Sequence, residues 1–380
     1  MGIGWNPSAL PDDDEGATLA GRVRTPGGVV PVLVRRGTIF SVFSEVATTA
    51  DLFDLDHPAA LTGRAICDVD ALGGEGSGAA FELRSPVDLQ CVKACGVTFA
   101  LSAIERVIEE RARGDSSAAA AIRAELEDKV GGGIRSVVPG SDDAARLKTA
   151  LIDAGMWSQY LEVAIGPDAE VFTKAPVLST IGWGGDIGIR SDSHWNNPEP
   201  EVVLVADARG RAVGACLGND VNLRDFEGRS ALLLGKAKDN NASCALGPFV
   251  RLFDDRFTMD DVRAAELDLT IDGADGYRLE GHSSMREISR DPDELVRQTL
   301  SEHQYPDGFA LFLGTLFAPV QDRDDPGRGF THKVGDVVTI RSDRLGSLVN
   351  TVTTSKAARP WETGIRALMR DIAARQAALA

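Results

Sequence analysis

Cysteine, histidine and long hydrophobic runs are scarce in this chain of 380 residues. Cys91 and Cys95 stand four positions apart, but no second Cys/His pair lies at zinc-finger spacing from them. With five cysteines in all, an odd and small number, a disulfide framework is not expected. The sequence therefore predicts reduced, buried thiols, as is typical of a cytoplasmic protein.

Positive charge is also in deficit. The chain has 40 lysines and arginines against 57 aspartates and glutamates, which gives a formal net charge of −17. Because binding to a phosphate backbone needs clustered basic side chains, we expect no nucleic-acid partner. The most apolar run, residues 309–320, is interrupted by Gly314, Thr315 and Pro319 and is too short to span a bilayer. The N-terminus has no basic head followed by an apolar segment, so neither a secretory signal nor a membrane association is expected.

Hydrophobic residues make up 43% of the chain, a globular composition. Short β-type runs separated by turn residues predict a small β-rich N-terminal domain over residues 1–84. The sequence pattern changes near residues 84–86, and a second, larger domain is expected over residues 85–380. Because residues 169–349 are mostly strand-like, the predicted fold class is α+β and β-rich.

Four segments show the periodicity of helices. Ser102 is followed three residues later by Glu105, the pattern of a capping box, which predicts a helix from residue 102 to about residue 113. The other helices are predicted over residues 118–130, 141–155 and 362–380. Ser141 is the expected N-cap of its helix, and Gly155 is the expected stop.

Two carboxylates stand at the start of the apolar strand pattern EVVLVAD. Since alternate residues of a strand share a face, Glu199 and Glu201 are expected side by side, about 7 Å apart at their Cα atoms. The turn DARGR predicts an antiparallel return along RAVGACLGND. With Arg209 at the turn centre, Glu199 lies opposite about residue 219, so Asp220 is expected beside the two glutamates.

Three carboxylates in one place repel one another unless a cation compensates them. Oxygen ligands favour a hard divalent ion, so the pattern predicts Mg²⁺ with Mn²⁺ as the second choice. Such a triad leaves other coordination positions for a chelating substrate and water. The residues alone leave one alternative open, in which these acids are solvated strand ends or protect an edge strand from aggregation.

Several motifs follow one another in a fixed order: PEPEVVLV, GNDVNLRD, a lysine about eighteen residues after the GND aspartate, SCALGP and FLGT. In this order and spacing they resemble the fumarylacetoacetate hydrolase superfamily over roughly residues 85–350. The longer phrases SHWNNPEPEVVL and HQYPDGFALFLGT resemble its bacterial 2-keto-3-deoxy-D-pentonate dehydratases. The resemblance implies a β-rich core of mixed sheets and a homodimer or homotetramer.

The resemblance also implies roles for individual residues. The family's E-x-E…D metal triad falls on the three acids derived above. The catalytic glutamate of the dehydratase branch matches Glu170, and its active-site lysine matches Lys238, with Lys236 selected instead if the match slips by two residues. Its substrate-binding threonine matches Thr315.

One departure from the family's hydrolases is informative. Those enzymes carry an H-x-x-E pair that activates water, whereas this chain has Ser102 at the histidine position and Glu105 at the glutamate position. Without the imidazole the base of the hydrolytic reaction is missing, which favours a lyase. Ser102 is then expected to bind substrate together with Thr315, and Glu105 is explained more simply as the capping partner of Ser102.

The resemblance therefore implies a hydro-lyase that takes a small-molecule sugar acid. The expected reaction is the Mg²⁺-dependent dehydration of 2-keto-3-deoxy-D-xylonate or -arabinonate to 2,5-dioxopentanoate (2-oxoglutarate semialdehyde), a step of D-xylose and other pentose breakdown. Glu170 is expected to do acid–base work at C3 and C4; Lys238 serves as a base if neutral or holds the substrate carboxylate if charged. Two alternatives stay open: a metal-dependent C–C hydrolase or decarboxylase of a 2-oxo acid, and a non-enzymatic protein that binds an acidic metabolite.

Overall fold

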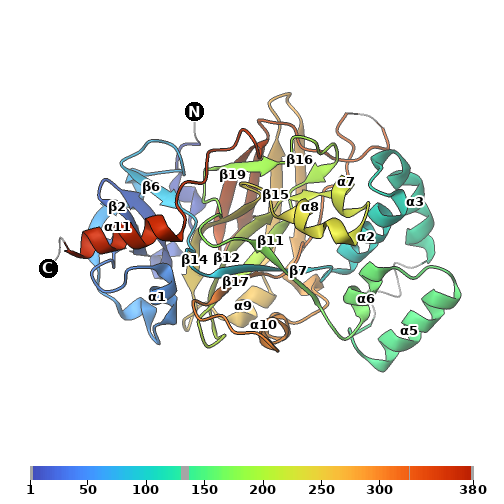
Figure 1. Cartoon of the computed structure of the whole chain (residues 1–380), viewed down its shortest axis with the longest axis horizontal. Helices are drawn as coiled ribbons and strands as arrows, with labels where there is room; N and C mark the ends of the chain where they lie inside the picture. Colours follow the sequence, from blue (N-terminus) through green and yellow to red (C-terminus); the bar gives the residue numbers. More distant parts are fainter. Residues whose placement is uncertain (1–2, 130–136, 325, 378–380) are drawn as a thin grey trace.

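The computed structural model describes residues 3–129, 137–324 and 326–377. Within them the strands form two large sheets, with helices at both ends of the molecule. Figure 1 shows α11 (Ile365–Ala377) beside the N-terminal strands at one end. At the other end lie α2 (Ala100–Ala112), α3 (Ser116–Lys129), α5 (Asp142–Asp153) and α6 (Gln159–Ile165). The β-rich α+β class predicted from the sequence is confirmed.

The larger sheet has twelve strands among the described residues, with the path β4-β3-β2-β1-β14-β12-β11-β17-β7-β8; β6 branches from β1, and β5 pairs with β6. Its N-terminal members are β1 (Leu19–Thr25), β2 (Gly28–Arg35), β3 (Thr38–Ser41), β4 (Arg64–Asp68), β5 (Leu72–Gly73) and β6 (Phe81–Arg84). Its other members are β7 (Cys91–Gly96), β8 (Glu170–Ala175), β11 (Pro200–Ala206), β12 (Ala212–Asp220), β14 (Cys244–Leu252) and β17 (Phe309–Phe312).

The smaller sheet has five strands, in the order β16-β15-β18-β19-β9. These are β16 (Arg278–Ser284), β15 (Glu266–Asp272), β18 (Val337–Ser342), β19 (Gly346–Thr354) and β9 (Asp186–Ile189). A short ribbon pairs β10 (Asn196–Asn197) with β13 (Asn222–Leu223). The remaining helices are α1 (Thr49–Asp54), α7 (Arg224–Glu227), α8 (Leu234–Lys238), α9 (Met259–Arg263) and α10 (Pro292–Leu300), and single 3₁₀ turns occupy Pro7–Ala9, Asp14–Gly16, Pro58–Ala60, Val69–Ala71, Ala231–Leu233 and Met285–Glu287.

Strand β11 lies at the centre of the core. Val202 and Leu204 on one of its faces belong to a hydrophobic cluster shared with the five-stranded sheet, whereas Val203 and Val205 belong to a second cluster on the opposite face. Both faces are therefore buried, which explains why the strand reads as a continuous apolar run rather than an alternating one. A strand held from both sides is a rigid base for side chains at its ends.

The N-terminal strands continue the larger sheet. Leu19 and Ala20 of β1 pair with Arg251 and Val250 of β14, so hydrogen bonding crosses the boundary predicted at residue 84. That pairing is short, and the other strands that pair with β1 are β2 and β6. Arg22 of β1 also donates to the carbonyls of Ser85 and Val87, on the far side of the predicted boundary. A division into residues 1–84 and 85–380 stays a prediction.

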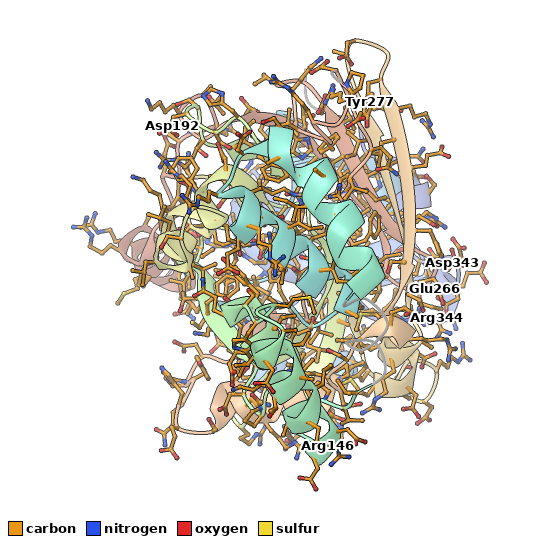
Figure 2. The ribbon with its side chains drawn as sticks, turned by 90° about the vertical axis from the view of Figure 1, so that its right-hand side faces the viewer. Arg146, Asp192, Glu266, Tyr277, Asp343 and Arg344 are labelled. Atoms are coloured by element: carbon orange, nitrogen blue, oxygen red, sulfur yellow. The ribbon has the colours of Figure 1, made fainter. Side chains whose placement is uncertain are left out.

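Helices α2, α3, α5 and α6 form a separate helical layer, which faces the viewer in Figure 2. The Ser141 hydroxyl accepts the Ala144 amide at 3.2 Å and caps α5, and Gly155 follows the helix with a φ of +67°. Both features were predicted. The capping box at Ser102 was wrong: α2 begins at Ala100 after Phe99, and Ser102 already lies inside the helix. Ile104, Val107 and their neighbours pack as predicted, because an apolar stripe specifies the face of a helix better than its end.

Candidate active site

The three acids predicted to converge do so at the junction of β11 and β12. Glu199 directly precedes β11, Glu201 is its second residue, and Asp220 is the last residue of β12. The register pairs Glu201 with Gly218, and the Asp220 amide donates to the Glu199 carbonyl at 3.0 Å. The turn is centred on Arg209, as predicted, because Ala206 pairs with Ala212. A register shift between Val205 and Ala206 then moves the rest of the pairing by one residue. One carboxylate oxygen from each acid lies within 4.8 Å of the others.

All three side chains are buried, at 1–2% exposure. They are therefore neither solvated strand ends nor protectors of an edge strand, and that alternative is wrong. Burial raises the pKa of Glu201 well above its ordinary value, and the charges of Asp220 and Glu199 raise it further. Such a group of buried carboxylates needs cations nearby.

Lysines supply part of that charge. Lys238, at the end of α8, forms ion pairs with Glu199 and with Asp220, the latter at 3.1 Å. Lys174 of β8 lies 2.7 Å from the other oxygen of Asp220 and is completely buried. Lys236 is exposed, so the geometry brings Lys238 and not Lys236 to the acids. Burial acts to lower the pKa of Lys238, but Asp220 and Glu199 outweigh it and raise that pKa, which keeps the ammonium charged.

An arginine that the sequence reasoning missed completes the cationic shell. Arg106 on α2 pairs with Glu199, with Glu109 at 2.5 Å and with Glu227 at 3.1 Å. Burial acts to raise the pKa of Glu199, but Lys238 and Arg106 lower it to about 2. The spacing of Arg106 and Glu109 is that of a helical ion pair, the only signal of this network that the sequence carries.

Glu201 is held by the loop after β17. Its two oxygens accept the Gly314 amide at 2.7 Å and the Thr315 hydroxyl at 3.1 Å. Gly314 has a φ of +106°, and a Cβ there would lie 1.9 Å from the Thr98 hydroxyl, so the close approach of this loop requires glycine. Thr315 is therefore fixed against a member of the triad.

Glu170 stands opposite Gly96 where β8 pairs with β7. Burial and the charge of Glu227 raise its pKa to about 7, although Arg106 and Lys238 oppose them.

Glu170 and Ser102 line one small cavity, where Ser102 donates its hydroxyl to the Thr315 carbonyl at 2.7 Å. The cavity measures about 20 Å³ and is lined by Cys95, Gly96, Val97, Ser102, Arg106, Glu170, Phe172, Glu199, Asp220, Glu227, Lys238 and Thr315. Six of the seven predicted site residues thus line one cavity, and the seventh, Glu201, contacts it through its hydrogen bond with Thr315.

The donor set fits a divalent cation. Five of the six oxygens of the triad accept one hydrogen bond, and the sixth, Oδ1 of Asp220, has only the ion pair with Lys174, so all retain capacity for another partner. Ligand oxygens around an octahedral Mg²⁺ lie about 3–4 Å apart, close to the spacing found here. Around the triad six carboxyl groups face four cations, so full ionisation of the carboxyl groups needs two further positive charges, which a divalent ion would supply. These groups are Glu109, Glu170, Glu199, Glu201, Asp220 and Glu227 against Arg106, Lys174, Arg224 and Lys238.

Fold and site together define a β-rich protein with a buried group of three carboxylates, suited to a divalent cation, at the ends of two central strands. The fumarylacetoacetate (FAA) hydrolase C-terminal family matches residues 156–353, more than half of the chain. The chain belongs to the FAA hydrolase family, as the sequence motifs predicted.

Two curated relatives are similar in sequence. One, from Haloferax volcanii and described as a probable 2-keto-3-deoxyxylonate dehydratase, is 33% identical over 202 residues, which are 53% of this chain and 66% of that protein. The other, 2-dehydro-3-deoxy-D-arabinonate dehydratase of Saccharolobus solfataricus, is 31% identical over 186 residues, which are 48% of this chain and 58% of that protein. The chain thus spans less than two thirds of either relative.

Solved structures share the fold. A 2-keto-3-deoxyarabinonate dehydratase in a hexagonal crystal form superposes with a TM-score of 0.64 at 21% identity, over 89% of this chain and 99% of that one. A structure of 2-keto-3-deoxy-D-arabinonate dehydratase complexed with magnesium and 2,5-dioxopentanoate gives a TM-score of 0.60 with the same coverage and identity. A 5-carboxymethyl-2-hydroxymuconate delta-isomerase from Mycobacterium smegmatis gives a TM-score of 0.53 at 19% identity, over 88% of this chain and 98% of that one.

None of the helices in the described residues has both the length and the apolar composition that spanning a membrane requires.

Proposed function

We propose that this chain is a Mg²⁺-dependent dehydratase that converts 2-keto-3-deoxy-D-xylonate or -arabinonate to 2,5-dioxopentanoate. The observation that carries the proposal is the buried triad beside a cavity that contains Glu170, Lys238 and Thr315. The two curated relatives are described as dehydratases of this substrate class, which supports the same reading.

The proposed roles follow from charge and position. Mg²⁺ bound by Glu199, Glu201 and Asp220 would supply a Lewis acid for the 2-oxo group of the substrate. Glu170, whose pKa of about 7 suits proton transfer at neutral pH, removes a proton from C3. Because Lys238 is charged, it serves as the proton donor to the departing C4 hydroxyl or as the clamp on the substrate carboxylate, and not as the base.

The products balance as one water and one oxo acid. Loss of a C3 proton and the C4 hydroxyl, together one water, leaves a C3=C4 double bond conjugated with the 2-oxo group. Conjugation makes the C5 protons acidic, and transfer of one of them to C3 gives an enol between C4 and C5, which tautomerises to the aldehyde. A cavity of about 20 Å³ holds one group of the size of water, so a five-carbon acid enters only when side chains at the site move. Assembly into a homodimer or homotetramer remains part of the proposal.

The hydrolytic alternative has less support in the geometry. Glu105, which stands at the position of the family's hydrolytic glutamate, forms a bidentate pair with Arg123 at 2.8 and 3.1 Å. Neither Glu105 nor a histidine is among the residues that line the cavity. A water-activating pair of the hydrolase kind is therefore not assembled by the described residues.

The deciding experiment is an assay of product identity. The purified protein is incubated with 2-keto-3-deoxy-D-xylonate and, separately, with the arabinonate, each with Mg²⁺, Mn²⁺ or EDTA. An NADP-dependent semialdehyde dehydrogenase reports 2,5-dioxopentanoate, while pyruvate and CO₂ are measured in parallel. Aldehyde formation that EDTA abolishes is expected. Pyruvate or CO₂ in its place would move the function to a hydrolase or decarboxylase, and metal binding without turnover would leave a metabolite-binding protein.

A further inference from the structure

A second cavity lies outside the active site, between α3 and the loop that follows β17. Its volume is about 250 Å³, and it has no lining residue in common with the active-site cavity. The lining residues are Ala119, Arg123, Trp195, Arg224, Val320, Gln321, Asp322, Gly327, Arg328 and Gly329. It has room for a small metabolite of a few carbon atoms, which nothing in the proposed reaction requires.

Two buried donors at this cavity lack partners. Arg224 and Trp195 are 1% and 3% exposed, yet the Arg224 Nη2 and the Trp195 indole Nε1 have no hydrogen bond within the described part of the chain. Buried donors of this kind are nearly always satisfied, because leaving one unpaired costs free energy. The two side chains are neighbours, since the Arg224 guanidinium lies 5.5 Å from the centre of the Trp195 ring. Both side chains line the cavity, so each brings an unpaired donor to the same small region.

Arg224 is held firmly on its other side. Its Nε donates to the Asn197 side chain at 2.8 Å and lies 3.3 Å from a carboxylate oxygen of Glu109. An anchored guanidinium presents its remaining N–H groups in a fixed direction, which is the geometry that binds carboxylates through two parallel hydrogen bonds. A rigid donor of this type selects an oxyanion over a neutral molecule.

The charged residues that line the second cavity also favour an oxyanion. Three arginines line the cavity against one acid, Asp322. Two backbone amides, those of Gly327 and Gly329, each donate to the Asp322 carboxylate at 2.7 Å and reduce its repulsion of an anion. Arg123 also pairs with Glu105, and Arg224 with Glu109, so both charges are shared with acids outside the lining. Arginines still outnumber acids along the wall, which favours an anion over a cation.

We propose that this cavity is a second binding site, separate from the active site, for a small metabolite that carries a carboxylate. The carboxylate accepts hydrogen bonds from Arg224 and from the Trp195 indole, and Arg123 and Arg328 contribute attraction from the rim. The proposal does not depend on the proposed dehydratase activity.

Binding is tested on the full chain labelled with ¹⁵N-tryptophan. The chain has five tryptophans, and a Trp195→Phe variant assigns the indole signal of Trp195. Succinate is the probe, with inorganic phosphate, chloride and glucose titrated separately. A saturable change of the Trp195 signal with succinate is expected, because its N–H gains an acceptor. No change, or a response to phosphate without a response to succinate, would overturn the proposal.

Two matched variants locate the site. Val320 is partly exposed at the cavity, so Val320→Phe fills it from the surface, whereas Val334→Phe alters an exposed valine that does not line it. We expect Val320→Phe to weaken succinate binding by about tenfold or more and Val334→Phe to leave it unchanged. Equal affinity in both variants would place the succinate elsewhere and refute the assignment. Arg224 itself is left in place, since its removal would also take a partner from the buried Glu109.

Discussion

Lys238 and Glu199 form a buried ion pair between the end of α8 and the start of β11, 39 positions apart in the sequence. Each group sets the charge of the other: the lysine helps to lower the pKa of Glu199 to about 2, and the glutamate helps to keep the lysine charged. Arg106 holds the second oxygen of Glu199 from α2. The start of β11 is therefore tied to two helices by charge.

The first prediction concerns the metal. Glu199→Gln removes the charge of one metal ligand, and the affinity for Mg²⁺ should fall by about 100-fold or more. Loss of a residue that only hydrogen-bonds a metal ligand typically costs about 10- to 100-fold. Calorimetry measures the affinity, and Glu266→Gln, an exposed change on β15, is the control. Unchanged affinity in Glu199→Gln would remove Glu199 from the metal site.

The second prediction separates the two lysines. Lys238→Ala should lower turnover by about 10²–10⁴-fold, the usual cost of losing a group that transfers a proton in the transition state. Lys236→Ala should leave turnover within about twofold, since an exposed lysine without a buried partner contributes little. Steady-state rates decide between them. The reverse ranking would show that the match to the family is displaced by two residues.

A third prediction tests the placement of Glu170 without altering it. A Cβ at Gly96 would lie 1.9 Å from the Glu170 carboxylate, so Gly96→Ala should displace that side chain and reduce turnover. The backbone of Gly96 does not need a positive φ, so the fold should persist, as thermal unfolding can verify. Gly364→Ala, where the added methyl group meets open space, is the control. Full activity in Gly96→Ala would argue that Glu170 takes no part in the reaction.

The fourth prediction concerns pH. Burial raises the pKa of Glu170 from its ordinary value of 4.5 to about 7, so this carboxyl group is protonated below pH 7 and ionised above it. If it accepts the C3 proton, kcat/KM at saturating Mg²⁺ should rise with pH through about 7. Glu170→Gln should be slow at every pH and lack this limb. A rate that falls through the same range in the wild-type protein would make Glu170 the acid instead.

The fifth prediction concerns stability. Arg106→Met leaves Glu109, Glu199 and Glu227 without a shared cation, and removal of one partner from a buried ion pair typically costs about 3–5 kcal/mol. Arg111→Met, on the exposed side of the same helix, should change stability by about 0.5 kcal/mol or less. Denaturant unfolding measures both. A loss below 1 kcal/mol in Arg106→Met, on the scale of an exposed pair, would mean that the carboxylates share their charge with other groups.

Strand alternation and one tight turn, both visible in the sequence, were sufficient to predict that Glu199, Glu201 and Asp220 converge. Glu199 and Glu201 share a face because strand side chains alternate, and a single tight turn brings Asp220 back beside them. The cap at Ser141 and the apolar stripe of α2 were also predictable, since both depend on residues within one or two turns. The start of α2 was not, because Ser102 turns its hydroxyl to the Thr315 carbonyl, 213 positions away, instead of capping its own helix.

The sequence alone determined the strand-rich class, the family and the three acids, because these depend on periodicity, short spacings and motif order. Tertiary structure alone decided how the acids are neutralised. Arg106, Lys174 and Lys238 reach them from α2, β8 and α8, and no local pattern records a meeting of three such distant segments. The second cavity arises in the same way, from the contact of α3, the loop after β17 and Arg224. Buried charge must find its partner wherever packing places one, so its energetics are set by the whole fold.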